Sequence, residues 1–317
     1  MMDVLLATGN IWETLVRTAP QSAKFEVQIL STSIKPFRCG NRIPVKPDVS
    51  VADNPAADIL IFPELWLGPD ETLEGRYPQL MTYIRERHRA GTYLYSACSG
   101  ALMLAASGLL DGRSATSHWG YADLFRDQYP EVQFRPEPNL CFADDRGQIV
   151  TAGGTSSWHD LAIHIIAKHV SPGEALRITK VYLLKWHDEG QLPYSPLVRN
   201  SPHGDEKIKA CELWLSKHFC EAGVLRDAIQ HAGMAERTLK RRFRKATNSS
   251  MLAYIQNLRI EEAKYRLEST RYAVDEISAD VGYEDPAFFR RLFKRLTGLT
   301  PSAYRRLFQT VADYRAE

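Results

Sequence analysis

The chain repeats one pattern in its last third, as VLRDAIQHAGMAERTLKRRFRKAT at residues 224–247 and as AVDEISADVGYEDPAFFRRLFKRLT at residues 273–297. When Gly233 is aligned with Gly282, the apolar positions of the two copies agree, and the offset grows by one residue past the glycine. Each copy predicts a short helix, a turn where glycine enters the left-handed region at low steric cost, and a second helix. Two copies at near-constant spacing indicate a true internal repeat. The repeat therefore predicts two helix-turn-helix units in tandem.

The second helix of each copy is basic between apolar anchors. Leu239 with Phe243, and Phe289 with Phe293, recur at helical spacing and would hold each helix on its partner. Arginine can donate two hydrogen bonds to a guanine edge, and both Arg and Lys neutralise phosphates. We therefore predict DNA contacts from Arg237, Thr238, Lys240, Arg241 and Arg244 in the first copy and from Arg290, Arg291 and Lys294 in the second.

Some of these basic side chains have an alternative role. A charged helix face is often simply solvated. This interpretation applies best to three further basic residues of the same helices, Arg242, Lys245 and Arg295. Arg241 and Arg291 are also candidates for bracing the fold instead of touching DNA.

Residues 251–270 lie between the two copies and predict one long connecting helix, which would set the two second helices about one DNA turn apart. The apolar stripe with a period near 3.6 consists of Leu252, Ile255, Leu258, Ala263 and Leu267. Residues 205–308 resemble the DNA-binding domain of the AraC/XylS family of transcription regulators, in LRIEEAKYRLEST and VDEISADVGYEDPAFFRRLFKRLTGLTPSAYRRLF. The resemblance implies that the first recognition helix makes most base contacts, at Arg237, Lys240 and Arg241. Pro286 and Ala287 stand in the second helix where some relatives carry longer polar side chains.

Composition and charge are consistent with two domains of different character. The 317 residues suffice for two cores. Residues 205–317 hold 21 Lys and Arg against 16 Asp and Glu, a net charge of +5, whereas residues 1–204 hold 19 against 22, a net charge of −3. Between the domains, EGQLPYSPLVRNSPHG at residues 189–204 carries three prolines and two glycines and reads as a linker. We predict domains at residues 1–188 and 205–317.

Several classes of protein are not expected from this sequence. The start lacks a basic leader with a cleavage site, and no stretch approaches the roughly 20 apolar residues of a membrane span. The five cysteines are scattered and form no CxxC pair, so we expect no zinc site and no disulfide framework. We found no phosphate-binding loop or dinucleotide fingerprint. We therefore expect a cytoplasmic protein without a metal or cofactor.

Residues 1–188 alternate strand-like and helix-like segments. We predict strands at 4–8, 25–31, 58–62 and 92–97 and a helix at 78–91. This alternation predicts a doubly wound, flavodoxin-like α/β fold with a parallel sheet, whose ligand sites lie at the carboxyl ends of the strands.

The segment TYLYSACSGALMLAASGLLDG at residues 92–112 predicts a strand, a sharp turn at Cys98, Ser99 and Gly100, and a small-residue helix. A nucleophile elbow has this form, and a helix N-terminus favours the thiolate of a cysteine. His118 follows about twenty residues later and is placed to approach Cys98. Glu13 follows the first predicted strand and would reach the same end of the sheet.

Residues 1–185 resemble the ThiJ/PfpI group of the class I glutamine-amidotransferase-like superfamily, in YSACSGALMLAASGLLDGRSATSHW and in TAGGTSSWHDLAIHII at residues 151–166. The resemblance implies a cysteine, a histidine and an acid in one site, at Cys98, His118 and Glu13, here as vestiges of a catalytic set. A domain of this kind before an AraC-type domain resembles the GlxA-like subfamily, in which the first domain is regarded as a sensor.

The sensor would bind a small metabolite. Trp12, Trp66, Trp119 and Trp158 each follow a predicted strand, and two or three of them around Glu13 or Glu64 would suit an amino acid, an amine or a quaternary ammonium compound. The alternative is that these tryptophans pack in the hydrophobic core and bind no ligand. The predicted ligand-binding residues are Trp12, Glu13, Glu64, Trp66, Cys98, Ser99, His118 and Trp119.

Together these features predict a metabolite-controlled regulator of transcription that binds double-stranded DNA as a homodimer. By resemblance it acts with RNA polymerase as an activator. Two alternatives remain open: a cysteine-dependent hydrolase or amidotransferase-like enzyme, and a redox-sensing regulator that uses Cys98.

Overall fold

A computed structural model describes residues 1–19, 22–68, 71–198 and 203–312. The chain divides into two compact units, Met1–Gln191 and Leu192–Glu317, so the division falls inside the predicted linker. Residues 199–202 of that linker, and residues 313–317 of the predicted second domain, lie outside the described residues.

The first unit is built on a four-stranded sheet in the order β5 (Ile59–Phe62), β6 (Tyr93–Ser96), β10 (Ile149–Ala152) and β9 (Leu140–Phe142). β5, β6 and β10 are parallel, and β9 runs antiparallel to β10. The strand sequences ILIF, YLYS and IVTA lack the strict polar alternation of a half-exposed sheet, as expected for strands covered on both faces. The predictions of strands at 58–62 and 92–97 are confirmed.

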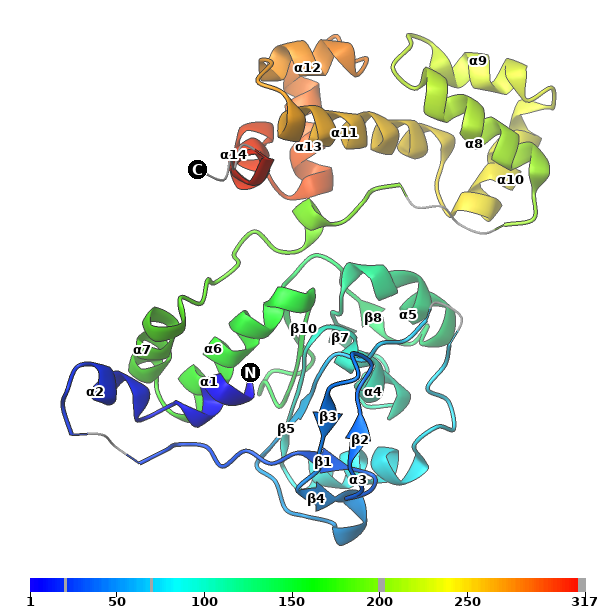
Figure 1. Cartoon of the computed structure of the whole chain (residues 1–317). Helices are drawn as coiled ribbons and strands as arrows, with labels where there is room; N and C mark the ends of the chain where they lie inside the picture. Colours follow the sequence, from blue (N-terminus) through cyan, green and yellow to red (C-terminus); the bar gives the residue numbers. More distant parts are fainter. Residues whose placement is uncertain (20–21, 69–70, 199–202, 313–317) are drawn as a thin grey trace. The chain divides into compact units, whose positions relative to one another are not determined.

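Helices cover both faces of this sheet (Figure 1). One face packs against α3 (Pro78–Arg89), α4 (Ala101–Ala106) and α5 (Ala122–Gln128), and the other against α1 (Met2–Leu6), α6 (Trp158–His169) and α7 (Pro172–Tyr182). Leu94 of β6 faces the first layer and Tyr95 faces the second, as the period of two in a strand requires. The predicted doubly wound, flavodoxin-like α/β fold is confirmed, and so is the helix at 78–91.

Short elements complete the first unit. The remaining strands pair as β1 (Leu30–Ser31) with β4 (Val49–Ser50), β2 (Phe37–Arg38) with β3 (Pro44–Val45), and β7 (Ser114–Ala115) with β8 (Gln133–Phe134). The other helical elements are α2 (Ile11–Leu15) and the 3-10 helices η1 (Val51–Asp53), η2 (Cys98–Gly100), η3 (Trp119–Tyr121) and η4 (Thr155–Ser157).

Two strand predictions are wrong. Residues 4–8 do not form a strand, because α1 covers most of this segment and buries Val4 and Leu5 against the sheet. A short apolar run fits a buried helical turn as well as a strand, and periodicity alone does not separate the two. Within 25–31, only Leu30 and Ser31 are in a strand.

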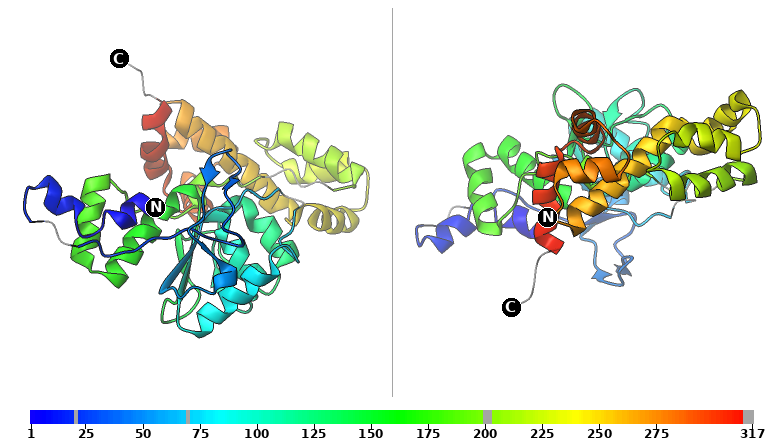
Figure 2. Two further views of the ribbon diagram at one scale, coloured as in Figure 1. Left: turned by 60° about the horizontal axis from the view of Figure 1, so that its bottom comes forward. Right: turned by 90° about the horizontal axis from the view of Figure 1, so that it is seen from above.

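The second unit is helical. Its elements are η5 (Leu192–Tyr194), α8 (Glu206–His218), α9 (Val224–His231), α10 (Glu236–Thr247), α11 (Met251–Ser269), α12 (Val274–Asp280), α13 (Pro286–Thr297) and α14 (Pro301–Ala312). The predicted repeat is confirmed, because α9–α10 and α12–α13 are the two helix-turn-helix units. Figure 2 shows the connecting helix α11 and its neighbours from two further sides, and α14 packs along it.

The long helix α11 joins two separate cores. Ile255 lies in the core of the first helix-turn-helix unit, and Ala263 and Leu267 lie in the core of the second. This confirms the predicted connecting helix. One member of its predicted apolar stripe is wrong, since the side chain of Leu252 is 54% exposed.

Both turns use glycine as predicted, but for different reasons. Gly233 has φ 61° and Gly282 has φ 90°. A Cβ on Gly282 would lie 2.4 Å from the carbonyl oxygen of Cys220, whereas a Cβ on Gly233 would meet nothing within 4 Å. Backbone angle requires glycine at the first turn, and both angle and space require it at the second. In the part of the chain that the structure describes, no helix has the length and apolar character needed to cross a membrane.

Candidate functional site

The predicted sharp turn at Cys98 is present. Cys98 lies two residues beyond the end of strand β6 and begins η2. Its φ is 52°, a left-handed conformation that is rare for a residue with a side chain. The Ser99 hydroxyl fixes the turn, because it accepts a hydrogen bond from the Leu65 N–H (2.7 Å) and donates one to the Leu65 carbonyl (2.6 Å). Gly100 is required here, since a Cβ would lie 2.2 Å from the carbonyl oxygen of Phe62. The elbow is thus built as a strained, tightly packed turn.

The thiol of Cys98 does not behave as its position at a helix start predicts. The residue is only 6% exposed, and burial raises the pKa of the Cys98 thiol. The nearby negative charge of Glu64 raises this pKa further, and hydrogen bonds from Ser99 and Thr155 only partly oppose the shift. The prediction of a favoured thiolate is therefore wrong. The helix α4 that follows is short, and the free-energy cost of burying a negative charge on the sulfur outweighs the favourable effect of the helix dipole on the thiolate.

The residue before His118 contacts the turn at Cys98. The hydroxyl of Ser117, the preceding residue, donates a hydrogen bond to the Cys98 carbonyl at 2.8 Å. His118 caps η3, and its Nδ1 accepts the Gly120 N–H at 3.0 Å. Its ring lies 4.7 Å from that of Trp119, measured between centroids. Three segments thus meet at the carboxyl ends of the strands: residues 96–100, residues 116–119 and, through Thr155, residues 153–155.

Glu13 has different neighbours from those predicted. It is buried in α2, where it accepts a hydrogen bond from Arg177 of α7 at 3.2 Å. Arg177 also pairs with Glu174 at 3.3 Å, so these three residues join α2 to α7. The premise for placing Glu13 beside Cys98 was a strand at 4–8, and that premise is wrong. The acid whose charge acts on Cys98 is Glu64.

The predicted aromatic residues do not all gather in one place. Trp66 is 94% exposed. Trp12 lies in α2, with the Lys180 ammonium 5.9 Å from its ring centroid. Trp119 lies beside His118, and Trp158 packs against the core of the first unit. An ammonium cage that uses both Trp12 and Trp66 is therefore not formed in this structure, because one contacts α7 and the other faces solvent.

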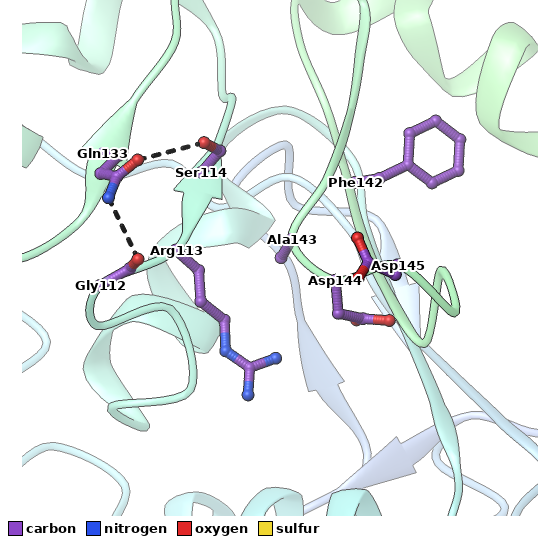
Figure 3. Close-up of a pocket in the computed structure, with 8 residues that line it drawn as sticks. All are labelled: Gly112, Arg113, Ser114, Gln133, Phe142, Ala143, Asp144 and Asp145. Atoms are coloured by element: carbon purple, nitrogen blue, oxygen red, sulfur yellow. Dashed lines mark hydrogen bonds between the residues drawn. The ribbon is translucent and has the colours of Figure 1, made fainter.

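Two cavities of the described chain lie elsewhere. The one in Figure 3 holds about 400 Å³ and is lined by Gly112, Arg113, Ser114, Gln133, Phe142, Ala143, Asp144 and Asp145. The other holds about 790 Å³ and lies between the two helix-turn-helix units, along α11. None of the predicted ligand-binding residues lines either cavity.

Sequence reasoning missed one buried polar residue near Cys98. Gln191 was assigned to the linker, yet it is 3% exposed and hydrogen-bonded to Thr116 and to Gly154. A proline-rich stretch of ordinary linker composition gives no sign that one of its side chains is buried in a neighbouring domain.

The basic face of α10 is as predicted. Leu239 and Phe243 are fully buried, and Thr238 is half-buried. The exposed cationic side chains are Arg237, Lys240, Arg241, Arg244 and Lys245. Lys240 pairs with Glu236 one turn earlier, an exposed pair that an incoming phosphate can replace at little cost. Arg242 is not a plain surface residue, since it forms two hydrogen bonds to Asp205 (2.6 and 2.9 Å) and lowers the pKa of that carboxyl group.

The second recognition helix, α13, carries its own acidic partners. Arg290 pairs with Asp275 of α12, and Arg291 lies 4.0 Å from Asp285. Lys294 is exposed on the same helix. Among the described contacts, Arg237, Arg241 and Arg244 of α10 have no carboxylate partner of this kind.

Comparisons with known proteins agree with both units. Residues 9–168 match the DJ-1/PfpI family, and residues 229–307 match a helix-turn-helix domain family. The chain is 26% identical over 276 residues to the HTH-type transcriptional regulator CdhR of Pseudomonas aeruginosa, covering 86% of this chain and 80% of that protein. It is 29% identical over 238 residues to the HTH-type transcriptional regulator GlxA of Rhizobium meliloti, covering 71% and 68%.

An enzyme is also among the relatives, over less than half of this chain. The isonitrile hydratase of Pseudomonas putida is 29% identical over 138 residues, covering 44% of this chain and 57% of that protein. The relatives that extend over both units are named as regulators. The chain therefore belongs to the DJ-1/PfpI family through residues 9–168 and, with its AraC-type helix-turn-helix domain, is a transcriptional regulator of the AraC family with a DJ-1/PfpI domain.

Proposed function

We propose that the chain recognises specific DNA sites mainly through α10 and activates transcription in response to a small metabolite bound in the first unit. The observation that carries the proposal is the exposed cationic face of α10 above a fully buried Leu239 and Phe243. A recognition helix needs both properties, because a rigid anchor fixes where each side chain meets the groove.

Within α10, Arg237 and Lys240 lie near the start of the helix, where a recognition helix contacts base edges. Arg237→Ala or Lys240→Ala is expected to weaken binding by about 1–3 kcal/mol and to relax the preference at one base position. The measurement is a binding titration on DNA selected from a random pool by the wild-type chain. Lys245→Ala, exposed on the same helix, is the matched control and should change affinity by less than about 0.5 kcal/mol.

A uniform loss across all sequences, with a shallower dependence on salt, would assign the residue to a phosphate instead of a base. Unchanged affinity in both variants would overturn the assignment of α10 as the reading helix.

We propose that the sensor site lies around Cys98 and Ser99 and includes Glu64, His118 and Trp119. Three contacts support this: the charge of Glu64 acts on Cys98, Ser117 donates to the Cys98 carbonyl, and His118 lies beside Trp119. Glu64 supports a ligand with a positive charge, such as an amino acid, an amine or a quaternary ammonium compound, beside the face of Trp119. The ligand must bind one arrangement of the chain better than another to alter DNA binding.

Thermal unfolding of the full chain against a panel of such compounds tests this site. A ligand present at 100 times its dissociation constant adds about 2.7 kcal/mol to the stability of the unit that binds it. Glu64→Gln should reduce the shift for cationic ligands, and an equal shift in this variant would overturn the role of Glu64.

We further propose that the chain works in the cytoplasm as a homodimer and contacts RNA polymerase. Dimerisation is supported by the gain in affinity when two linked modules engage paired half-sites. Sedimentation equilibrium across micromolar concentrations tests it, and a monomer at all of them would overturn it.

A second candidate is cysteine chemistry, and the strained backbone of Cys98 at φ 52° favours it. The raised pKa of the buried thiol opposes it at neutral pH. Cys98→Ser separates the two functions. A sensor keeps its ligand-dependent DNA binding in this variant, whereas an enzyme or a peroxide sensor loses turnover or its peroxide response.

A further inference from the structure

The carboxamide of Gln191 is hydrogen-bonded through both its oxygen and its nitrogen, as that of a bound ligand would be. Its Oε1 accepts the Gly154 N–H at 2.6 Å. Its Nε2 donates to the Thr116 hydroxyl, the Ser117 carbonyl and the Pro138 carbonyl, each at 3.1 Å. The residue is 3% exposed, and the side chains of Thr116 and Ser117 are completely buried. Every polar atom of the carboxamide is therefore paired inside the protein.

The surrounding groups select a carboxamide over related chemistry. They offer one donor to an oxygen and three acceptors to a nitrogen, which is the pattern of a primary amide. A carboxylate of the same shape would bring a negative oxygen against two backbone carbonyl oxygens in a buried site. The backbone also makes room for the group, since a Cβ on Gly153 would lie 2.2 Å from Nε2 of Gln191.

This carboxamide site shares a wall with the proposed sensor site. The Ser117 residue that accepts from Gln191 also donates its hydroxyl to the Cys98 carbonyl at 2.8 Å. A Cβ on Gly154 would lie 3.4 Å from Oε1 of Gln191 and 3.6 Å from Cδ2 of His118. A ligand beside Cys98 and His118 therefore touches the residues that hold Gln191.

Gln191 is also the last residue of the first unit. The chain is held again almost at once in the second unit, where the Ser195 carbonyl accepts from Lys264 at 3.0 Å and the Leu197 N–H donates to Glu261 at 2.7 Å. Only residues 192–194 separate these two sets of contacts. The connection has little slack, so the position of Gln191 restricts how the chain can leave the first unit.

We propose that Thr116, Ser117, Pro138 and Gly154 form a binding site for a primary carboxamide. In the resting chain, Gln191 occupies this site. A metabolite with a carboxamide group then displaces Gln191 and so changes DNA binding. The last step rests on the proposed sensor function, whereas the first two do not. A tethered side chain competes at an effective concentration in the millimolar range. The displacing metabolite therefore needs a second group that contacts the region of Cys98 and His118.

Removal and replacement of the side chain test the site. Gln191→Ala in the full chain removes the equivalent of one acetamide molecule and leaves the four partners in place. We expect the first unit to unfold at a temperature lower by about 4 °C or more, and the Gly154 amide to exchange its hydrogen faster. Acetamide should restore at least half of the lost unfolding temperature and of the lost amide protection, and the effect should saturate. Acetate at the same concentration should restore neither. The wild-type chain should respond to neither compound. Equal effects of acetamide on both proteins, or equal effects of acetate and acetamide, would overturn the carboxamide site.

A second variant covers the outcome in which Gln191→Ala does not fold. Gln191→Met fills most of the same space without hydrogen-bonding groups, and the Gly154 amide should lose its protection from exchange. Protection equal to that of the wild-type chain would overturn the role of the carboxamide.

The effect on DNA is measured separately, with DNA selected by the wild-type chain. A change in affinity in Gln191→Ala that acetamide reverses supports the coupling step. Rescue of stability with unchanged DNA affinity overturns that step alone and leaves the carboxamide site in place. A failure of rescue overturns the site, even where a metabolite from another class still controls DNA binding.

Discussion

Replacing His164 with phenylalanine should reduce the acid sensitivity of the first unit. His164 lies in α6, with its ring centroid 5.9 Å from that of Tyr95 and 5.2 Å from that of Phe142. Its Nε2 is buried and has no hydrogen-bond partner among the described residues. Burial, together with the smaller effect of the positive charges of Lys168 and His169, lowers the pKa of His164 to about 4. The folded chain thus holds this imidazole in its neutral form.

The size of the effect follows from linkage between protonation and folding. The unfolded chain binds a proton at His164 below pH 6.5, while the folded chain does so only near pH 4. The unfolded state therefore gains protons first, and the free energy of unfolding falls as the pH drops from 6.5 to 4. A difference of roughly 2.5 pKa units, at about 1.36 kcal/mol per unit, corresponds to a loss of about 3 kcal/mol. Phenylalanine has a similar shape and binds no proton, so His164→Phe should lose about 3 kcal/mol less over this range.

Urea denaturation of the full chain between pH 7.5 and pH 4.5 measures this difference. Tryptophan fluorescence is a suitable signal, because five of the six tryptophans lie in the first unit. Phe142→Leu is the packing control. It removes a ring beside His164 but keeps the imidazole, so the stability of this variant should still fall with pH, by no more than that of the wild-type chain. A His164→Phe chain that loses as much stability on acidification as the wild-type chain would refute the reasoning.

Three further predictions concern both units. Gly233→Ala should lower the free energy of unfolding of the second unit by about 1–2 kcal/mol, because of its left-handed backbone alone. Gly282→Ala should cost about 3 kcal/mol or more, because its Cβ also meets the Cys220 carbonyl. Calorimetric unfolding measures both, and equal losses would contradict the structure. Because burial raises the pKa of Cys98, its alkylation by iodoacetamide should stay slow at pH 7–8, and peptide mass spectrometry that finds it labelled as fast as an exposed thiol would count against this environment. Arg244→Ala should weaken DNA binding without lowering the unfolding temperature. Arg242→Ala loses the pair with Asp205 and should lower the unfolding temperature. The reverse pattern would make Arg242 the DNA contact and Arg244 the residue that stabilises the fold.

The helical unit was predictable because its signals are local. The spacing of Leu239 and Phe243 and the two turn glycines require only neighbouring residues to be interpreted. The strands at 58–62 and 92–97 were equally clear, as short apolar runs between polar segments. The error at residues 4–8 has a physical origin, since a short apolar run is compatible with any buried element and only packing on the sheet decides which one forms.

The candidate sites were less predictable because they depend on contacts between distant residues. The dipole of a helix start is visible in the sequence, but the burial that raises the pKa of Cys98 is not. Glu64 acts on Cys98 from a segment more than thirty residues earlier. The pair of Arg290 with Asp275 and the burial of Gln191 likewise join parts of the chain that no local pattern connects.

The acidic partners of α13 have a consequence for the information content of the sites that the proposed regulator would recognise. Both arginines of α13 must leave a carboxylate, Asp275 or Asp285, to contact DNA, whereas most cationic residues of α10 have none among the described contacts. Each such exposed pair is worth at most about 1 kcal/mol, so a favourable base at the α13 positions adds slightly less net free energy than one beneath α10. Each binding site should then be asymmetric, with strongly constrained base pairs in one half and tolerant base pairs in the other. Mutations in the tolerant half would change the strength of regulation in small steps, which allows a set of target promoters to be graded without changing the protein.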